Sequence, residues 1–253
     1  MAERRVLVTG ATDGIGEEIA RQLAARGVPV IVHGRTRAKA DAALQRTGAA
    51  EIAVADLASF AQVRAMAEAI DGPLGGLVNN AGIGYGTAPP RGIRTEDGHE
   101  PTWQVNFLSA FLLTEALRGQ LRGGRVVHVS SGVHSSGEVD LEQPDEPRFA
   151  TPYAQSKIAL VMLAREQGER WGDQGPAVNS CSPGWIATKM GGSGGGALAD
   201  GADTPVWLLT DPALAGVTGR YFWQRREEEP NPQTEDAAAR RRLRELAAAA
   251  VRA

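Results

Sequence analysis

The stretch RVLVTGATDGIG, residues 5–16, decides the fold of this chain. Its first four residues are mostly aliphatic and β-branched, which predicts a buried strand. The three glycines that follow, Gly10, Gly14 and Gly16, permit a tight turn, and the amphipathic residues 15–26 predict a helix after it. A helix N-terminus offers free N–H groups and the positive end of the helix dipole, so this turn predicts a pyrophosphate site.

The spacing of the glycines narrows the class of nucleotide. Three residues separate Gly10 from Gly14 and one separates Gly14 from Gly16, which differs from the Gly-x-Gly-x-x-Gly pattern. No Gly-Lys-Ser/Thr follows, which excludes a nucleoside triphosphate P-loop. A glycine-rich turn alone is weak evidence, but the strand before it and the helix after it favour a dinucleotide.

Strand-like and helix-like stretches alternate along the rest of the chain. β-branched runs occupy 28–33, 51–55, 76–79, 125–130 and 176–181, and amphipathic stretches occupy 36–46, 59–70, 100–118 and 153–171. This alternation predicts an α/β fold, a doubly wound parallel sheet of the Rossmann type. No linker or repeat divides the chain, so we expect one domain over 1–253. A last helix, roughly 233–251 and ending RRRLRELAAAAVRA, has five arginines in it and just after it, interpreted as a solvated face.

Composition excludes several functions. A net charge of -3 and a pI near 5.9 provide no polycation for nucleic acid and no basic patch for a membrane. No signal-peptide-like stretch and no run of ~18 apolar residues occur, so we expect a cytoplasmic protein. The single cysteine, Cys181, excludes an internal disulfide and is expected to be an inert core thiol. The histidines at 33, 99 and 128 lack ligand spacing, so no metal is expected.

The end of the second strand, HGRT at 33–36, indicates which dinucleotide binds. An acidic side chain at this point would hold the ribose 2′-OH of NAD, but the chain has Gly34 followed by Arg35. A guanidinium binds a 2′-phosphate well, so we expect NADP. Asp13, an acidic residue in the glycine-rich turn, argues against binding of a 2′-phosphate, but we expect its role to be capping of the following helix.

The segment YAQSK, residues 153–157, places a phenol and an ammonium one helical turn apart on the same face. A tyrosine pKa near ~10 must fall by about 3 units, or roughly 4 kcal/mol, before the group exchanges protons near neutrality. A cation at about 5 Å in an effective dielectric of ~20 supplies about 3 kcal/mol. A tyrosine and a lysine at this spacing also occur by chance, usually as a surface lysine on an amphipathic helix. The neighbouring motifs must therefore decide whether this pair is catalytic.

These neighbouring motifs resemble those of the short-chain dehydrogenase/reductase family, in its compact single-domain branch. The likeness covers nearly the whole chain and rests on the turn at 9–16, DL at 56–57, NNAG at 79–82, Asn106, SS at 130–131, YAQSK at 153–157 and PGWIAT at 183–188. The extended branch of the family would require glycine at position 13, where this chain has Asp13.

The resemblance implies a catalytic role for four residues. Tyr153 would be the general acid/base, and Lys157 would lower its pKa and bind the nicotinamide ribose. Ser131 would bind the substrate carbonyl oxygen, and Asn106 would hold a water that links Lys157 to solvent. The reaction would be hydride transfer between NADP(H) and a carbonyl or alcohol.

The resemblance also implies a set of cofactor-binding residues. They follow the strands and the expected lid loop in family order: Gly10, Thr12, Asp13, Gly14, Ile15, Gly16, Arg35, Thr36, Asp56, Leu57, Asn80, Ala81, Gly82, Tyr153, Lys157, Pro183, Gly184, Ile186 and Thr188.

The segments outside these motifs are similar to the retinol-dehydrogenase-like branch and to bacterial ketoreductases, which act on lipophilic or bulky substrates. Substrate loops are expected at about 132–152 and 188–203, and the glycine-rich tract 191–201 is interpreted as a mobile loop. Trp185 could stack on an apolar substrate or on the protein itself, whereas Trp103 is expected in the core. Homo-oligomers are common in the family.

Two other functions were weighed. His134 near Ser131 could suggest a serine hydrolase, but the flank HVSSG at 128–132 is not a Gly-x-Ser-x-Gly elbow. A redox sensor that binds NADP without turnover is the alternative to an enzyme. Such a protein can lose its catalytic groups, and Asn106, Ser131, Tyr153 and Lys157 are all present here.

Overall fold

The computed structural model describes residues 4–252, so the first three residues and the last residue of the predicted domain lie outside it. Its strands and helices alternate as the sequence predicts. In chain order they are β1 (Arg5–Val8), α1 (Gly14–Ala24), β2 (Val30–Gly34), α2 (Arg37–Thr47), β3 (Glu51–Val54), α3 (Phe60–Ala69), β4 (Leu74–Asn79), α4 (Pro101–Trp103), a π-helix (Gln104–Leu108), α5 (Ser109–Ala116), β5 (Arg125–Val129), α6 (Pro152–Trp171), β6 (Ala177–Ser182), α7 (Leu198–Thr210), β7 (Tyr221–Trp223), β8 (Arg226–Glu227) and α8 (Ala237–Ala250).

The strands of the described chain form one sheet in the order β3-β2-β1-β4-β5-β6-β7-β8. Neighbouring strands from β3 to β7 pair in parallel, and only the short β8 runs antiparallel to its neighbour. The order reverses between β1 and β4, because the chain leaves β3 at one edge and returns beside β1. In open α/β sheets, ligands bind outside the carboxyl ends of the strands at such a point.

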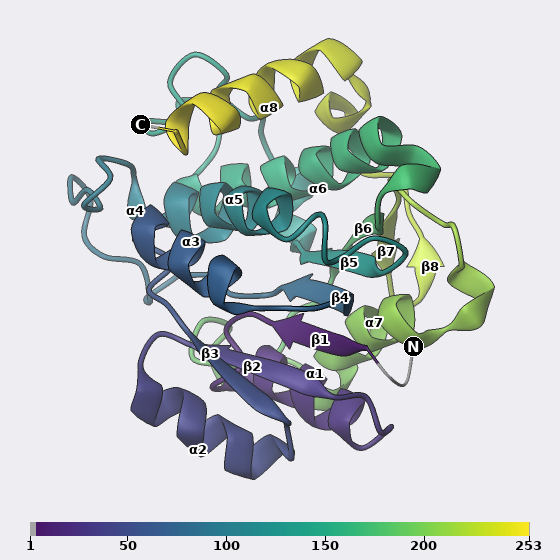
Figure 1. Ribbon diagram of the computed structural model, residues 1–253. Coiled ribbons are helices and arrows are strands. Elements are labelled where there is room, and N and C mark those ends of the chain that lie inside the picture. The colour runs from purple at the N-terminus through teal and green to yellow at the C-terminus, as the bar shows by residue number, and fades with distance from the viewer. Residues whose placement is uncertain (1–3, 253) are drawn as a thin grey trace.

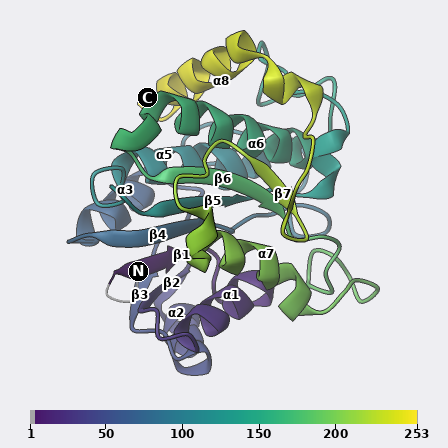
Figure 2. The same cartoon turned by 90° about the vertical axis from the view of Figure 1, so that its right-hand side faces the viewer.

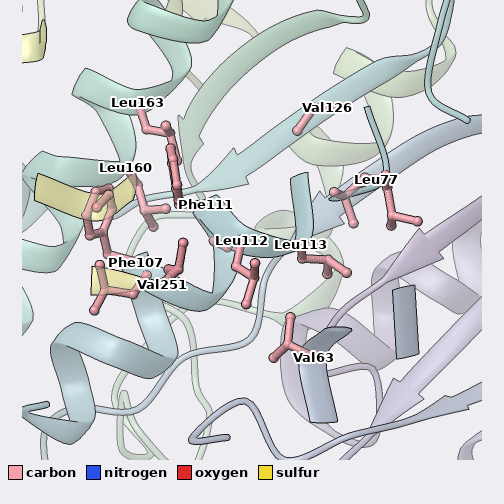
Figure 3. Close-up of a cluster of buried hydrophobic side chains, with 14 of the residues drawn as sticks. Val63, Leu77, Phe107, Phe111, Leu112, Leu113, Val126, Leu160, Leu163 and Val251 are labelled. Atoms are coloured by element: carbon pink, nitrogen blue, oxygen red, sulfur yellow. The ribbon is translucent and has the colours of Figure 1, made fainter. Parts of the chain in front are cut away.

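Helices cover both faces of the sheet, and each face has its own core (Figure 1). Helices α1, α2 and α7 pack on one face over valines of β1 and β2. On the other face, α3, α5 and α6 enclose a larger cluster around the fully buried Phe107, shown in Figure 3. Figure 2 shows α8 as an additional layer outside α6. The predicted doubly wound Rossmann fold is confirmed.

The arginines of α8 depart from the predicted solvated face. Arg240 is 4% exposed and its guanidinium bonds Glu169 of α6 at 2.6 Å, and Arg244 bonds Glu166 at 3.0 Å. Arg241 and Arg242 are exposed, as expected. The helix therefore uses part of its positive charge to dock on α6. Within residues 4–252, no helix combines the length and the apolar character that crossing a bilayer requires.

Several elements differ from the sequence prediction. Helix α7 begins at Leu198, inside the segment 188–203 that was expected to be a loop, and the short strands β7 and β8 were not predicted. The predicted helix over 100–118 contains a π-helical turn at 104–108. Trp103 and Cys181 are buried, as expected, and burial raises the pKa of the Cys181 thiol far above its ordinary value.

Candidate active site

A cavity of about 730 Å³ opens at the carboxyl ends of the central strands, at the reversal of strand order. Most of the residues predicted to bind the cofactor form its wall: Gly10, Thr12, Asp13, Gly14, Ile15, Gly16, Arg35, Asp56, Leu57, Asn80, Ala81, Gly82, Tyr153, Lys157, Pro183 and Thr188. Five predicted residues lie outside the wall, namely Thr36, Asn106, Ser131, Gly184 and Ile186.

The glycine-rich turn is shaped by close backbone approaches. Gly10 has φ +63°, and a Cβ at this position would lie 2.8 Å from the Cα of Ala81. A Cβ at Gly16 would overlap the carbonyl oxygen of Gly10. Side chains are therefore excluded from the turn, which leaves its surface open to a phosphate at the start of α1.

His33 supports this turn from beneath, a role that the sequence analysis missed. Its Nδ1 accepts a hydrogen bond from the Gly10 N–H at 3.0 Å, and its Nε2 lies 3.1 Å from the carbonyl oxygen of Ala55. Nε2 must therefore carry the proton. Burial lowers the pKa of His33 to about 4, so the ring stays neutral and keeps both bonds at neutral pH.

The end of β2 carries two basic side chains toward the cavity. Arg35 and Lys39 both line its wall beside Gly34. Thr36, predicted to bind the cofactor, instead accepts a 3.5 Å hydrogen bond from the Lys39 N–H as the N-cap of α2. Lys39, in the first turn of α2, was not predicted.

Asp13 does not cap α1 with its side chain, contrary to the expectation. It occupies the N-cap position, but its carboxylate makes no cap hydrogen bond and pairs with the Lys189 ammonium at 2.5 Å. Both residues line the cavity, so this ion pair connects the glycine-rich turn to the loop after β6. Exposure of both side chains keeps the energy of the pair small.

Tyr153 and Lys157 lie in the first turns of α6. Thr151 caps the helix by accepting from the Ala154 N–H at 3.1 Å, and Pro152 occupies the first position, which its fixed φ favours. The Lys157 ammonium lies 5.5 Å from the centre of the Tyr153 ring and donates to the carbonyl oxygen of Val129 at 2.9 Å. Ser131, just beyond β5, lies beside the Tyr153 side chain and acts to lower its pKa.

The electrostatics of this pair differ from the expectation. Burial raises the pKa of Tyr153, and the Ser131 side chain opposes this rise only in part. Burial also lowers the pKa of Lys157 to about 8. The predicted lowering of the Tyr153 pKa by Lys157 is therefore not seen in the structure, because removal of the phenol from water outweighs the effect of an ammonium bonded to a strand carbonyl.

Asn106 lies in the π-helical turn, and its side chain makes three direct hydrogen bonds. Its Oδ1 accepts from the Ile83 N–H at 2.8 Å, and its Nδ2 donates to the Ile83 carbonyl at 3.0 Å and to Ser156 Oγ at 3.0 Å. A π-turn inserts one extra residue into a helix and is frequent at functional sites. Here the π-turn points the Asn106 amide toward the loop after β4, and the amide lies next to Gly82, a residue of that loop in the cavity wall.

The glycine-rich tract after β6 is a compact turn. The Trp185 indole N–H donates to the Gly191 carbonyl at 2.8 Å, and β-bridges join Ile186 to Gly196 and Thr188 to Gly192. A Cβ at Gly191 would overlap the Ile186 carbonyl oxygen. Gly191 and Gly195 thus serve close packing, a role that the interpretation as a mobile loop missed.

The insert at 132–152 is anchored away from the cavity wall. The buried carboxylate of Asp140 accepts a hydrogen bond from the Arg148 guanidinium at 2.6 Å. It also accepts a hydrogen bond from the Glu142 backbone N–H. The fully buried Gln155 accepts from the Asp140 N–H and donates to the Pro144 carbonyl. No residue of 132–152 lines the cavity, so its predicted role as a substrate loop stays a proposal.

Three large aromatic side chains are exposed on segments that adjoin the cavity. Tyr85 is 56% exposed, and its ring centre lies 4.9 Å from that of Tyr153. Trp185, in the loop after β6, is 69% exposed, and Trp223, at the end of β7, is 44% exposed. Trp223 pairs in register with Ser182, and its indole nitrogen lies beside Gly184.

Several known proteins are similar to this chain in sequence. A family model described as short chain dehydrogenase matches residues 4–195. A candidate daunorubicin C-13 ketoreductase, DnrU, of Streptomyces sp. strain C5 is 35% identical, covering 98% of this chain and 92% of the relative. Polyprenol dehydrogenase of Mus musculus is 36% identical, covering 95% and 81%. Retinol dehydrogenase 14 of Homo sapiens is 32% identical, covering 96% and 84%.

Solved structures share the fold. The crystal structure of an uncharacterized protein from Mycobacterium paratuberculosis superposes with a TM-score of 0.83 at 28% identity, covering 99% of this chain and 94% of that one. A blue fluorescent protein from a metagenomic library, crystallised with NADPH, gives a TM-score of 0.70 at 30% identity, covering 87% and 95%.

Proposed function

Because this chain belongs to the short-chain dehydrogenase family of oxidoreductases, we propose that it transfers a hydride between NADP(H) and the carbonyl or alcohol of a lipophilic or bulky substrate. The observation that carries the proposal is the meeting of Ser131, Tyr153 and Lys157 beside the cavity at the reversal of strand order. Relatives named as ketoreductase, polyprenol dehydrogenase and retinol dehydrogenase favour an enzyme over a redox sensor.

The residues of the cavity fit a dinucleotide with a 2′-phosphate. Gly10 and Gly16 let the backbone of the turn pack closely, because a Cβ at either position would clash. No side chain at these positions then obstructs a pyrophosphate at the N-terminus of α1. Arg35 and Lys39 supply two positive charges where an acidic residue would favour NAD. NADPH, when bound, would supply the hydride.

The catalytic groups would handle the proton and the developing charge. In carbonyl reduction, the Tyr153 hydroxyl donates its proton to the growing alkoxide, and Ser131 donates a hydrogen bond to the same oxygen. These bonds strengthen as negative charge develops, so they lower the barrier. The Lys157 ammonium favours the tyrosinate left behind, and Asn106 holds the loop after β4 against the site.

The exposed aromatic side chains support a lipophilic substrate. Tyr85 stands against the ring of Tyr153, and Trp185 and Trp223 flank Gly184. Aromatic side chains contribute a large apolar surface with few rotatable bonds, which suits the body of an extended or polycyclic ketone.

The test is NADPH oxidation, followed by absorbance, on a panel of lipophilic ketones and aldehydes, with Tyr153→Phe and Ser131→Ala as controls. We expect at least one panel member to be reduced, and each variant to lose on the order of 100-fold or more in kcat. Tight NADPH binding with no reduction across a broad panel would favour the redox sensor. Full activity in Tyr153→Phe would refute the proposed acid.

A further inference from the structure

His134 lies three residues beyond Ser131 and is bonded to the backbone of that residue twice. Its imidazole Nδ1 lies 2.8 Å from the Ser131 carbonyl oxygen, and its backbone N–H donates to the same oxygen at 3.0 Å. These bonds close a short 3-10 turn, Gly132–Ser135, directly after the strand that carries Ser131. The Ser131 carbonyl is thereby held by two donors.

The geometry defines the tautomer of His134. A carbonyl oxygen can only accept, so Nδ1 carries the proton. Nε2 is buried and has no partner among the described residues, so a second proton there would be an unsatisfied buried donor. Burial accordingly lowers the pKa of His134, and the ring is neutral.

Distant parts of the chain hold this imidazole in place. The Tyr221 ring of β7 packs against it with ring centres 4.3 Å apart, and the His134 side chain and backbone together are only 5% exposed. The carbonyl of His134 accepts from Asn231 Nδ2 at 2.9 Å, and the same amide donates to Gly137. The ring is therefore fixed between the sheet and the segment that leads to α8.

The hydroxyl of Ser131 has little local support of its own. Its Oγ accepts from the Val133 N–H at 3.4 Å, the outer limit of a useful hydrogen bond, and its other contact is Tyr153. The direction of this hydroxyl thus depends on the Ser131 backbone. We propose that His134 is a positioning residue, which fixes the Ser131 backbone so that its hydroxyl meets Tyr153 and the substrate oxygen. This inference rests on the proposed function of Ser131.

Two amide substitutions distinguish the positioning role of His134 from a general contribution to packing. In His134→Asn the amide nitrogen can take the place of Nδ1, whereas in His134→Gln it takes the place of Nε2. We expect His134→Gln to lose about 10- to 100-fold in kcat on the best-reduced ketone of the panel, since small misplacements cost that much. His134→Asn should recover most of the loss. KM and the NADPH dissociation constant, measured by fluorescence, should stay within about two-fold in both.

A double-mutant cycle identifies the partner of His134. In a Ser131→Ala background, His134→Gln should change kcat by no more than about two-fold, because the hydroxyl that it positions is gone. Gln233→Leu is the matched control: Gln233 joins Val139 to the C-terminal segment through both amide atoms, so this variant should lower the unfolding midpoint and leave kcat unchanged.

Either of two results would overturn the inference: the same fold loss from His134→Gln with and without Ser131, or equal kcat losses in the Asn and Gln variants. A fully active His134→Gln, alongside inactive Tyr153→Phe and Ser131→Ala, refutes the role of His134 and leaves the proposed reaction standing. Full activity in Tyr153→Phe refutes the proposed acid, and with it the role assigned to Ser131 beside it.

Discussion

Lys157 should make the stability of the protein depend on pH. Burial lowers its pKa from 10.5 to about 8, so the unfolded chain binds more protons between these values, and stability should rise with pH across that window. The charged ammonium should cost up to about 3 kcal/mol below pH 8. We expect Lys157→Met to be more stable than wild type at pH 7.5 and to lose this advantage by pH 10.5, as measured by urea unfolding. A constant difference would contradict the buried charge.

Arg35 and Lys39 are the residues that should select the cofactor. We expect Arg35→Ala to weaken NADPH binding by about 10- to 100-fold and NADH binding little, since a charge-assisted bond to phosphate contributes about 1.5–3 kcal/mol. Lys39→Ala should act in the same direction with a smaller effect. Arg37→Ala is the control, because Arg37 pairs with Asp41 and lies off the cavity wall. Equal losses for both cofactors, in fluorescence titrations, would refute the assignment.

At the scale of elements, the ion pair between Asp13 and Lys189 joins the turn before α1 to the loop after β6. Lys189→Ala leaves an uncompensated carboxylate at the cavity, which should repel a phosphate. We expect it to weaken NADPH binding about 2- to 5-fold at low salt, a range set by the small energy of exposed pairs. Asp13→Asn in the same background should restore the affinity. Failure of that rescue would show that Lys189 acts in another way.

The elements were predicted well wherever local sequence decides them. β1 matches residues 5–8, because a β-branched run ends at glycine, and α6 starts within one residue of its predicted position, because Thr151 and Pro152 begin it. Helix α7 was missed because it follows glycines and contains Pro205.

In the candidate site, the motifs indicated Tyr153, Lys157 and other residues that mostly line one cavity, and their roles stay predictions. The local bond between His134 and the Ser131 carbonyl was missed because a short 3-10 turn after a strand has no clear sequence pattern. The role of His33 was missed because it depends on the Gly10 N–H, which only the tertiary fold brings near. The direction of the Tyr153 pKa was wrong for the same reason, since burial cannot be read from a five-residue motif.

At the scale of the whole molecule, α8 completes the larger core. Leu243 is 2% exposed within the cluster that includes α3, α5 and α6. We expect Leu243→Ala to lower the free energy of unfolding by about 2–5 kcal/mol, through lost apolar burial and a residual cavity. Arg242→Ala, on the exposed face of the same helix, should stay within about 0.5 kcal/mol. Urea unfolding measures both, and equal effects would show that α8 is not part of the core.

The packing of the tract after β6 has a consequence for how the chain tolerates mutation. Low-complexity glycine runs usually accept almost any substitution, yet a Cβ at Gly191 would overlap the Ile186 carbonyl oxygen, and one at Gly195 would overlap the Ile186 carbonyl carbon. In a library of single substitutions selected for activity, these two glycines should be as depleted of variants as Gly10 and Gly16. Gly192, with open space around its Cβ, is limited only by its φ of +72° and should accept asparagine.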